Sequence, residues 1–353
     1  MFNIGNIFAF PYALGLWARN LAFDKGWIKS VKFDNVAILS FGNITVGGTG
    51  KTPHVEYFIR HLLDNAYRVA VISRGYGRQN PKTSRFVEVD SRVEDVGDEP
   101  LQIKRKFPQV KVIVDKDRVR AVKMLMALPF GDVPEVILLD DGMQYRRLTP
   151  TRQITLINYN RPLFKDSLLP FGRLRDLPSQ LKRADTVIIT KCPPYLSEFE
   201  KQQAVSVNRI GEKQKVFFTT VQYFDPIAVF PEGNNRYMYS HEAILFTGIA
   251  GSSQLRHHVS ARYPRNFHIE FGDHHVFTDK DIKQIEKFAD KHPQAILITT
   301  EKDSQRLRRN PAVSERLKEK IFYIPIEVGL VEDESADGLF DVKELAASRL
   351  CAA

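Results

Sequence analysis

Glycines, a lysine and a hydroxyl residue are concentrated in one short segment, which consists of Val46, Gly47, Gly48, Thr49, Gly50, Lys51 and Thr52. An apolar run precedes this segment and a helical pattern follows it. The backbone N–H groups of such a loop can turn onto phosphate oxygens, and the following helix adds the positive end of its dipole. In this pattern the lysine binds the β- and γ-phosphates, and the threonine hydroxyl binds Mg²⁺. The segment therefore predicts a phosphate-binding loop for ATP and Mg²⁺, although Thr45 replaces the first glycine of GxxxxGK[ST].

Two aspartates, Asp140 and Asp141, end an apolar run that reads EVILLDD. In proteins with a phosphate-binding loop, an acid at the end of a buried strand helps to hold Mg²⁺, because its carboxylate compensates the charge of the ion. Such an acid is weak evidence by itself and becomes informative beside the loop. We therefore assign Asp140 and Asp141, together with Thr52, to a metal site.

The chain of 353 residues is basic, with a formal net charge of +9. A basic excess suits nucleic acid, an anionic membrane face or a phosphorylated substrate. No nucleic-acid recognition motif is present, so we expect no nucleic-acid partner. A basic stretch runs from Arg146 to Arg183. The arginines that we consider as ligands of phosphate groups are Arg74, Arg78, Arg173 and Arg175, and a solvated surface is the alternative for each of them.

The composition, with 43% apolar and 26% charged residues, is that of a globular protein of about two domains. The two cysteines, Cys192 and Cys351, lack CxxC spacing, which argues against a disulfide framework or zinc site and favours a reducing cytoplasm.

Apolar β-rich runs alternate with helical patterns, which predicts an α/β fold of the P-loop NTPase type: a mostly parallel sheet with helices on both faces. The expected strands of this first domain are 35–44, 67–73, 111–114, 135–141, 154–158 and 186–191, with a helix over 52–65. The pattern restarts after about residue 221, beyond a β-strand linker at 216–224. The second, smaller α/β domain is expected to begin with a strand and a glycine loop over 243–252 and a helix from 253. Strands at 267–271, 295–300 and 321–328 and a helix over 279–291 are expected to follow, and the last strand pairs beside the linker. The resulting organisation is an N-terminal arm (1–30), a P-loop domain (31–221), a smaller α/β domain (222–328) and a tail (329–353).

The N-terminal arm is uncharged as far as Arg19 and rich in aromatic and aliphatic residues. It lacks the basic start of a signal peptide, and polar residues interrupt the roughly 20 apolar residues that a membrane span needs. Aromatic residues followed by basic ones are typical of a helix that lies in a membrane interface. The alternative is an apolar arm packed on its own domain.

Seven segments occur in one order along most of the chain: GNITVGGTGKTP (42–53), SRGYGR (73–78), VGDEP (96–100), DDGMQYRRL (140–148), LLPFGRLRD (168–176), FGDHHVFTDKD (271–281) and TTEKDSQRL (299–307). Together they closely resemble the tetraacyldisaccharide 4′-kinase family, the lipid A 4′-kinases. This chain departs from the family pattern at Met143, Tyr145, Asp176 and Gly272.

The resemblance implies transfer of the γ-phosphate of ATP, with Mg²⁺, to the 4′-hydroxyl of a tetraacylated glucosamine disaccharide 1-phosphate, which gives lipid IVA. It also implies a peripheral enzyme on the cytoplasmic face of an inner membrane. The family's catalytic pair corresponds to Asp98 and His274, which act with Lys51. Glu99 maps to the metal site. The residues that map to positions that contact the substrate or support those that do are Arg74, Tyr76, Gln144, Arg175, Asp176 and Asp273.

General chemistry supports this pair, because a sugar hydroxyl is a poor nucleophile and needs a base to take its proton. Since Asp98 falls in the first expected domain and His274 in the second, we expect the two to meet when the domains close. A different P-loop ATPase or an ATP-dependent synthetase is the enzymatic alternative. A membrane-associated regulatory ATPase is the non-enzymatic alternative.

Overall fold

The computed structural model describes residues 10–249, 251–273 and 275–331. The chain divides into two compact units. The first consists of Met1–Asp90, Ile103–Val221 and Val328–Ala353, and the second of Ser91–Gln102 and Gln222–Glu327. The expected arm (1–30) and tail (329–353) fall partly outside the described residues. Ser91–Gln102, which the expected P-loop domain (31–221) includes, groups with the second unit, and the domain bounds stay a prediction.

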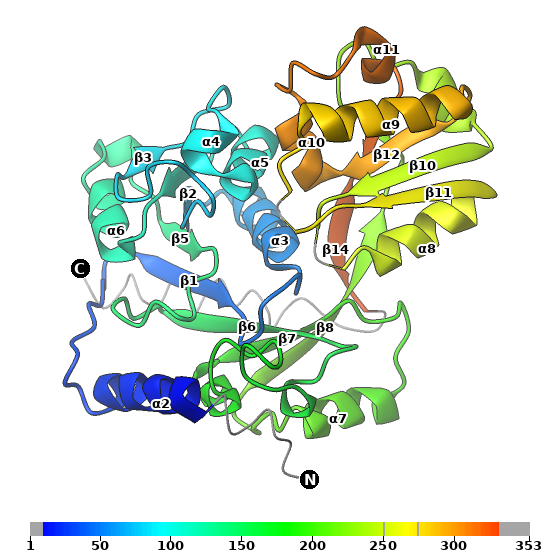
Figure 1. Ribbon diagram of the computed structural model, residues 1–353. Coiled ribbons are helices and arrows are strands. Elements are labelled where there is room, and N and C mark those ends of the chain that lie inside the picture. Colours follow the sequence, from blue (N-terminus) through cyan, green and yellow to red (C-terminus); the bar gives the residue numbers. More distant parts are fainter. Residues whose placement is uncertain (1–9, 250, 274, 332–353) are drawn as a thin grey trace. The chain divides into compact units, whose positions relative to one another are not determined.

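A long sheet forms the centre of the first unit (Figure 1). Its strand order within the described residues is β14-β8-β7-β6-β1-β5-β2-β4-β3. From β8 to β4 in that order every strand is parallel to its neighbour, whereas β3 is antiparallel to β4. The strands are β1 (Ala37–Gly42), β2 (Val69–Ser73), β3 (Arg85–Phe86), β4 (Lys111–Val114), β5 (Val136–Leu139), β6 (Arg152–Asn158), β7 (Thr186–Thr190), β8 (Lys215–Tyr223) and β14 (Ile326–Leu330).

One face of this sheet is covered by α3 (Lys51–Asp64). Its buried apolar residues lie at the spacing of a single helix face: Val55, Phe58, Ile59 and Leu62. The ring of Phe58 meets that of Phe41 on β1 edge to face, with 4.7 Å between centroids. This contact places the middle of α3 against the carboxyl end of β1.

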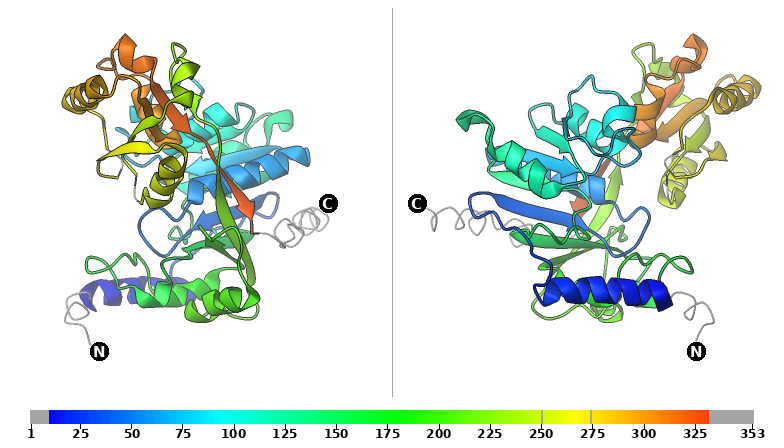
Figure 2. Two further views of the ribbon diagram at one scale, coloured as in Figure 1. Left: turned by 90° about the vertical axis from the view of Figure 1, so that its right-hand side faces the viewer. Right: turned by 60° about the vertical axis from the view of Figure 1, so that its left-hand side comes forward.

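The opposite face is covered by α6 (Arg118–Met126) and α7 (Glu198–Val207). Residues of α6 share a core cluster with Ile38, which points away from Phe41 because side chains alternate along a strand. Ala204 of α7 packs with Phe218, whereas the next residue, Thr219, bonds to α3. Figure 2 shows α7 together with α2 (Phe10–Asp24) on the side away from α3.

A smaller sheet forms the centre of the second unit. Its strand order within the described residues is β11-β10-β12-β13-β9. Its strands are parallel except β9. They are β9 (Ile227–Ala228), β10 (Glu242–Thr247), β11 (Arg265–Glu270), β12 (Ile296–Thr300) and β13 (Ile321–Ile324). α8 (Ser253–Arg262) and α9 (Asp279–Lys291) pack against two different core clusters, one on each face. The shorter helices are α4 (Val93–Val96), α5 (Asp98–Lys106), α10 (Glu301–Leu307) and α11 (Glu315–Lys318), and the 3₁₀ turns are η1 (Phe130–Asp132), η2 (Leu163–Lys165), η3 (Pro178–Arg183) and η4 (Asn235–Tyr239).

The α/β fold expected from the sequence is confirmed in both units. The helix over 279–291 has the expected bounds, and Thr278 begins it with a capping box. The expected strand over 321–328 is divided at Pro325 into β13 and β14. β14 neighbours β8 in the large sheet, as expected for pairing beside the linker.

Candidate active site

The phosphate-binding loop joins the carboxyl end of β1 to the first residue of α3. Backbone φ is positive at Gly47 (95°) and Gly50 (85°), where glycine is free of the strain that a side chain would cause. Thr45 instead forms an antiparallel bridge with Leu174, and the Val46 N–H donates to the Arg173 carbonyl at 2.7 Å. Thr45 therefore fits the loop, because its position is part of a β-bridge and does not need a positive φ.

Four polar side chains, Asn43, Lys51, Asp141 and Arg175, form what we call the P-loop cluster. Lys51 Nζ lies 3.5 Å from Asn43 Oδ1 and 3.7 Å from Asp141 Oδ1. Arg175 donates to both carboxylate oxygens of Asp141 and to Asn43 Oδ1. Because β5 pairs directly with β1, the acids that follow β5 reach the same sheet edge as the loop.

Asp141 stays ionised in this cluster. Burial alone would raise its pKa, but the charge of Lys51, the hydrogen bond and charge of Arg175 and the charge of Arg118 outweigh burial and hold the pKa well below its usual range. A fixed negative charge thus lies among several cations at the end of the loop. Asp140, the other expected metal ligand, is buried beside it.

The buried side chain of His54 on α3 holds the loop by hydrogen bonds. Its Nδ1 lies 2.7 Å from the Gly50 carbonyl, and its Nε2 lies 2.9 Å from Thr219 Oγ1. Since a carbonyl can only accept, Nδ1 carries the proton and Nε2 accepts from the threonine hydroxyl. Burial lowers the pKa of His54 to about 4, against a partly opposing hydrogen bond to Gly50. The ring is therefore neutral at physiological pH.

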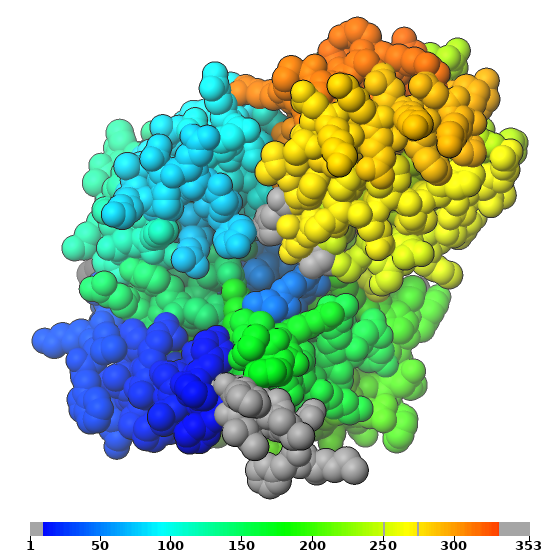
Figure 3. Space-filling model, viewed as in Figure 1, coloured from blue at the N-terminus to red at the C-terminus, as the bar shows by residue number. Residues whose placement is uncertain are grey.

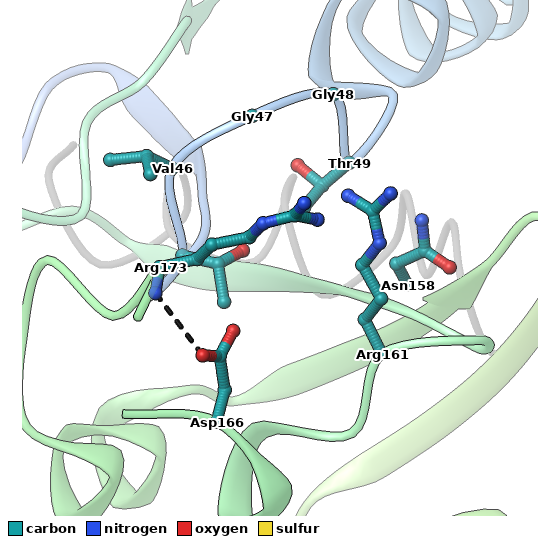
Figure 4. Close-up of a pocket in the computed structure, with 9 residues that line it drawn as sticks. Val46, Gly47, Gly48, Thr49, Asn158, Arg161, Asp166 and Arg173 are labelled. Carbon is teal, nitrogen blue, oxygen red and sulfur yellow. Dashed lines mark hydrogen bonds between the residues drawn. The ribbon is translucent and has the colours of Figure 1, made fainter. Parts of the chain in front are cut away.

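A small pocket adjoins the loop (Figure 4). Its lining consists of residues 45–49 together with Asn158, Arg161, Asp166 and Arg173. In Figure 4 the guanidinium groups of Arg161 and Arg173 both point toward Thr49. Burial lowers the pKa of Arg161, and the like charge of Arg173 lowers it further. Two neighbouring cations beside the loop favour an anionic ligand, as expected for Arg173.

The other expected phosphate and substrate residues of the first unit differ in their surroundings. Arg74 and Tyr76 are exposed beyond the end of β2. Arg78 is buried and donates to the Pro81 carbonyl at 3.0 Å, so it holds its own loop. Gln144 donates to the Asn43 carbonyl at 2.8 Å and thereby joins the P-loop cluster. Asp176 is buried and accepts from Asn20 of α2 at 2.9 Å, so it anchors that helix.

Sequence reasoning did not single out His54 and Arg161, nor three further residues of this site. Asn43 is fully buried and bonds to Lys51, Arg175 and Thr49, and the signal for it is a polar residue between strand and loop. Arg118 lies over the ring of Tyr145 at 5.1 Å and acts electrostatically on Asp141. Thr190 donates to the Thr49 carbonyl at 2.9 Å, which ties β7 to the loop.

The expected base, Asp98, is the first residue of α5 and lies in the second unit. Its buried carboxylate is ion-paired with Arg306, and Lys302 Nζ lies 3.8 Å away. Glu99, an expected metal ligand, is ion-paired with Lys302 at 3.0 Å. The sequence placed Asp98 in the P-loop domain, and its ion-pair partners are side chains of the second unit.

The other two residues expected in the second unit come from the DHH segment. Asp273 is exposed. His274 lies outside the described residues, so its pairing with Asp98 stays a prediction. Within the described residues no cluster of three or more His, Cys, Asp or Glu side chains could hold a metal by itself.

Comparisons with known proteins agree with the seven ordered segments. A family model described as tetraacyldisaccharide-1-P 4′-kinase matches residues 3–343. The tetraacyldisaccharide 4′-kinase of Phocaeicola vulgatus is 41% identical over 332 residues, which cover 92% of this chain and 89% of that protein. The enzyme of the same name from Porphyromonas gingivalis is 40% identical over 328 residues, with coverage of 92% and 91%.

The chain belongs to the tetraacyldisaccharide-1-P 4′-kinase family. A crystal structure of LpxK from Aquifex aeolicus in complex with ATP is similar, with a TM-score of 0.71, 27% identity and coverage of 96% of this chain and 97% of that one. The family resemblance and the fold inferred from the sequence are thus confirmed. In this kinase-family chain Tyr145 donates to Asp117 Oδ1 at 2.7 Å, which holds the N-cap of α6 next to Arg118.

We expect His54 to make the first unit less stable in acid. Its pKa is about 4 in the folded protein and 6.5 in the unfolded chain, so protonation favours the unfolded chain as pH falls. This stabilisation is complete above pH 6.5 and is lost toward pH 4, by about 3 kcal/mol. His54→Gln keeps a donor and an acceptor but does not titrate. The free energy of unfolding of both proteins is measured with denaturant between pH 7 and 4, and we expect it to fall more in wild type. An equal fall in both proteins would contradict the buried, neutral state of His54.

We expect Lys51→Ala to fold normally and to lose phosphoryl transfer, because its ammonium neutralises charge that grows on the transferred phosphate. Loss of one such preorganised donor costs about 10²–10³-fold in kcat. Turnover of ATP should be compared with that of Lys29→Ala, which removes an exposed lysine in the first unit. A folded Lys51→Ala protein with near-normal turnover would exclude the P-loop mechanism.

Proposed function

We propose that this protein transfers the γ-phosphate of ATP to the 4′-hydroxyl of a tetraacylated glucosamine disaccharide 1-phosphate and so forms lipid IVA. Family membership and the names of the relatives support this substrate. The structural observation that carries the proposal is the P-loop cluster, in which Lys51 and Arg175 converge on Asp141 at the end of the phosphate-binding loop. A cationic end of this kind suits the γ-phosphate, where charge develops during transfer.

Mg²⁺ fits the donors at this sheet edge. Magnesium prefers hard oxygen ligands and is held in such enzymes by one or two carboxylates together with substrate phosphates and water. Thr52 is the second residue of α3, and Asp140 and Asp141 follow the neighbouring strand β5, so a hydroxyl and two carboxylates lie at this edge. We propose that these residues hold the ion, which neutralises phosphate charge when bound. Glu99 is the further proposed ligand.

The proposed step is an in-line displacement at the γ-phosphorus. The 4′-oxygen of the sugar forms a bond to phosphorus as Asp98 takes the hydroxyl proton, and the bond from the γ-phosphorus to the β,γ-bridging oxygen breaks. ADP leaves with that electron pair, and Lys51 stabilises the negative charge on the phosphates. We propose that His274 orients the carboxylate and shares the proton. Arg74, Tyr76, Gln144, Arg175, Asp176 and Asp273 are the proposed substrate or supporting residues.

An acceptor assay tests the function directly. Purified protein is mixed with radiolabelled ATP, Mg²⁺ and the disaccharide 1-phosphate, and the labelled glycolipid is separated and counted. A labelled 4′-phosphate is the expected product. Phosphate release that does not depend on the acceptor would favour a regulatory ATPase, and label on a carboxylate acceptor would favour a synthetase.

We expect Asp98→Asn to lower kcat by about 10²–10⁴-fold, the usual contribution of a general base. Asparagine keeps the size of the side chain but cannot take the proton. Glu94→Gln is the matched control, because Glu94 is an exposed acid close by in the same segment. Wild-type kcat in Asp98→Asn would contradict the assignment of the base.

We also propose that the protein binds the cytoplasmic face of the inner membrane through α2. This helix carries no charge before Arg19 and lies on the surface of the first unit, where it is dark blue in Figure 3. Phe10, Leu14 and Trp17 lie on one helix face and are 63%, 51% and 53% exposed. Exposed apolar residues grouped in this way mark an interaction surface. Among the described residues no helix is both long and apolar enough to cross a bilayer.

Other residues of α2 are bonded to the site segments of the first unit. Asn20 donates to Asp176, Tyr12 donates to the Arg175 carbonyl at 3.0 Å, and Arg146 donates to Asp24 at 2.6 Å. These contacts leave the apolar face of α2 available and fix the helix to residues next to the P-loop cluster. A membrane-bound α2 would therefore keep the catalytic residues close to an acylated substrate in the same membrane.

We expect the double variant Leu14→Glu/Trp17→Glu to lose binding to vesicles of phosphatidylethanolamine and phosphatidylglycerol, because two charges on the apolar face oppose insertion. Sedimentation with the vesicles measures the bound fraction. Phe130→Glu is the control, since Phe130 is 94% exposed in η1, away from α2. If the double variant sediments as well as wild type, α2 is a packing element only.

A further inference from the structure

Arg306 of α10 connects two segments that carry the proposed catalytic pair. Its side chain is only 7% exposed. Its Nη1 donates to the His275 carbonyl at 3.0 Å, and its Nη2 donates to Asp98 Oδ2. One guanidinium group therefore bonds to the base and to the backbone of the residue next to 274.

The guanidinium group of Arg306 is itself fixed by a buried carboxylate. Asp303 Oδ1 accepts from Arg306 Nη1 at 3.1 Å. The other oxygen, Oδ2, accepts from the Gly248 N–H at 2.9 Å and from Thr300 Oγ1 at 2.8 Å. Asp303 is fully buried, so these bonds are shielded from water. The segment TTEKDSQRL thus builds a rigid holder for Arg306.

Lys302, from the same segment, has a different main partner. Its Nζ lies 3.0 Å from Glu99 Oε1 and 3.8 Å from Asp98 Oδ2. Arg306 is therefore the cation in direct contact with the base, and Lys302 is chiefly the partner of Glu99. Asp98 is also fixed on its other oxygen, because Oδ1 accepts from the Glu99 N–H at 3.0 Å.

We propose that Arg306 is a positioning residue that orients the Asp98 carboxylate and ties it to the DHH segment. The proposal rests on the proposed function, in which Asp98 takes the proton of the acceptor hydroxyl. A base displaced by about 1 Å can lose about 10²-fold in rate, so a fork of fixed donors on its carboxylate matters for kcat. Because Arg306 does not touch the substrate in this scheme, its loss leaves the KM of the acceptor essentially unchanged.

A double-mutant cycle separates this role from a general effect on the fold. Arg306→Gln is made in the wild-type chain and in Asp98→Ala, and the initial rate of transfer to the disaccharide is measured over a range of acceptor concentrations for all four proteins. In the wild-type chain we expect kcat to fall by about 10–10²-fold with KM unchanged. In Asp98→Ala we expect less than about 3-fold further loss, since residues that serve one step are not additive.

Arg308→Gln is the matched control, because Arg308 is an exposed arginine at the end of the same helix. Thermal unfolding of the full chain checks that each variant is folded. If Arg306→Gln does not fold, Arg306→Lys is used in the cycle, because an ammonium group cannot reproduce the fork of bonds to three oxygens. The same loss is then expected.

The outcomes distinguish this inference from the proposed function. Equal losses in both backgrounds, an Arg306 variant as active as wild type, or a raised KM with normal kcat would each overturn the positioning role. If the wild-type protein makes no phosphorylated glycolipid, or if Asp98→Ala is fully active, the proposed function or its base is wrong instead.

Discussion

The ion pair between Arg175 and Asp141 is the interaction on which the nucleotide site of the first unit depends. Lys51, Arg175 and Arg118 all act on Asp141, and without its negative charge these cations would repel one another at one sheet edge. The segment of Arg175 also pairs with the entrance of the loop, since the Arg175 N–H donates to the Ile44 carbonyl at 2.8 Å. Charge balance and loop geometry are thus provided by the same short segment.

The same segment connects the nucleotide site to the surface of the first unit. Residue 176 follows Arg175 directly, and its buried carboxylate accepts from Asn20 of α2. Arg19 of α2 donates to the Gln144 carbonyl, and Gln144 in turn donates to Asn43 of the P-loop cluster. A helix with an exposed apolar face is therefore two hydrogen bonds from the residues around the phosphate-binding loop. In an enzyme for an acylated sugar, this arrangement would keep phosphate transfer close to the membrane surface.

Local patterns in the sequence were sufficient for most of the fold and for the loop. Continuous apolar runs located the parallel strands, and VGGTGKT located the phosphate site, because both signals are contained in neighbouring residues. Asn43 and Arg306 were missed as individual residues, because their importance arises from contacts across long stretches of chain. The ion pairs of Asp98 with Lys302 and Arg306 are of the same kind, because they connect positions about 200 residues apart.

The division of the chain separates the two halves of the proposed chemistry. Lys51, Asp141 and Arg175, which are suited to ATP, belong to the first unit, whereas Asp98, Glu99 and the residues that hold them belong to the second. In the proposed mechanism, the carboxylate of Asp98 is oriented by residues of its own unit, Arg306 and the Glu99 N–H, before the acceptor hydroxyl reaches it. Preorganisation of this kind lowers the reorganisation needed at the moment of transfer, which is where electrostatic catalysis gains most.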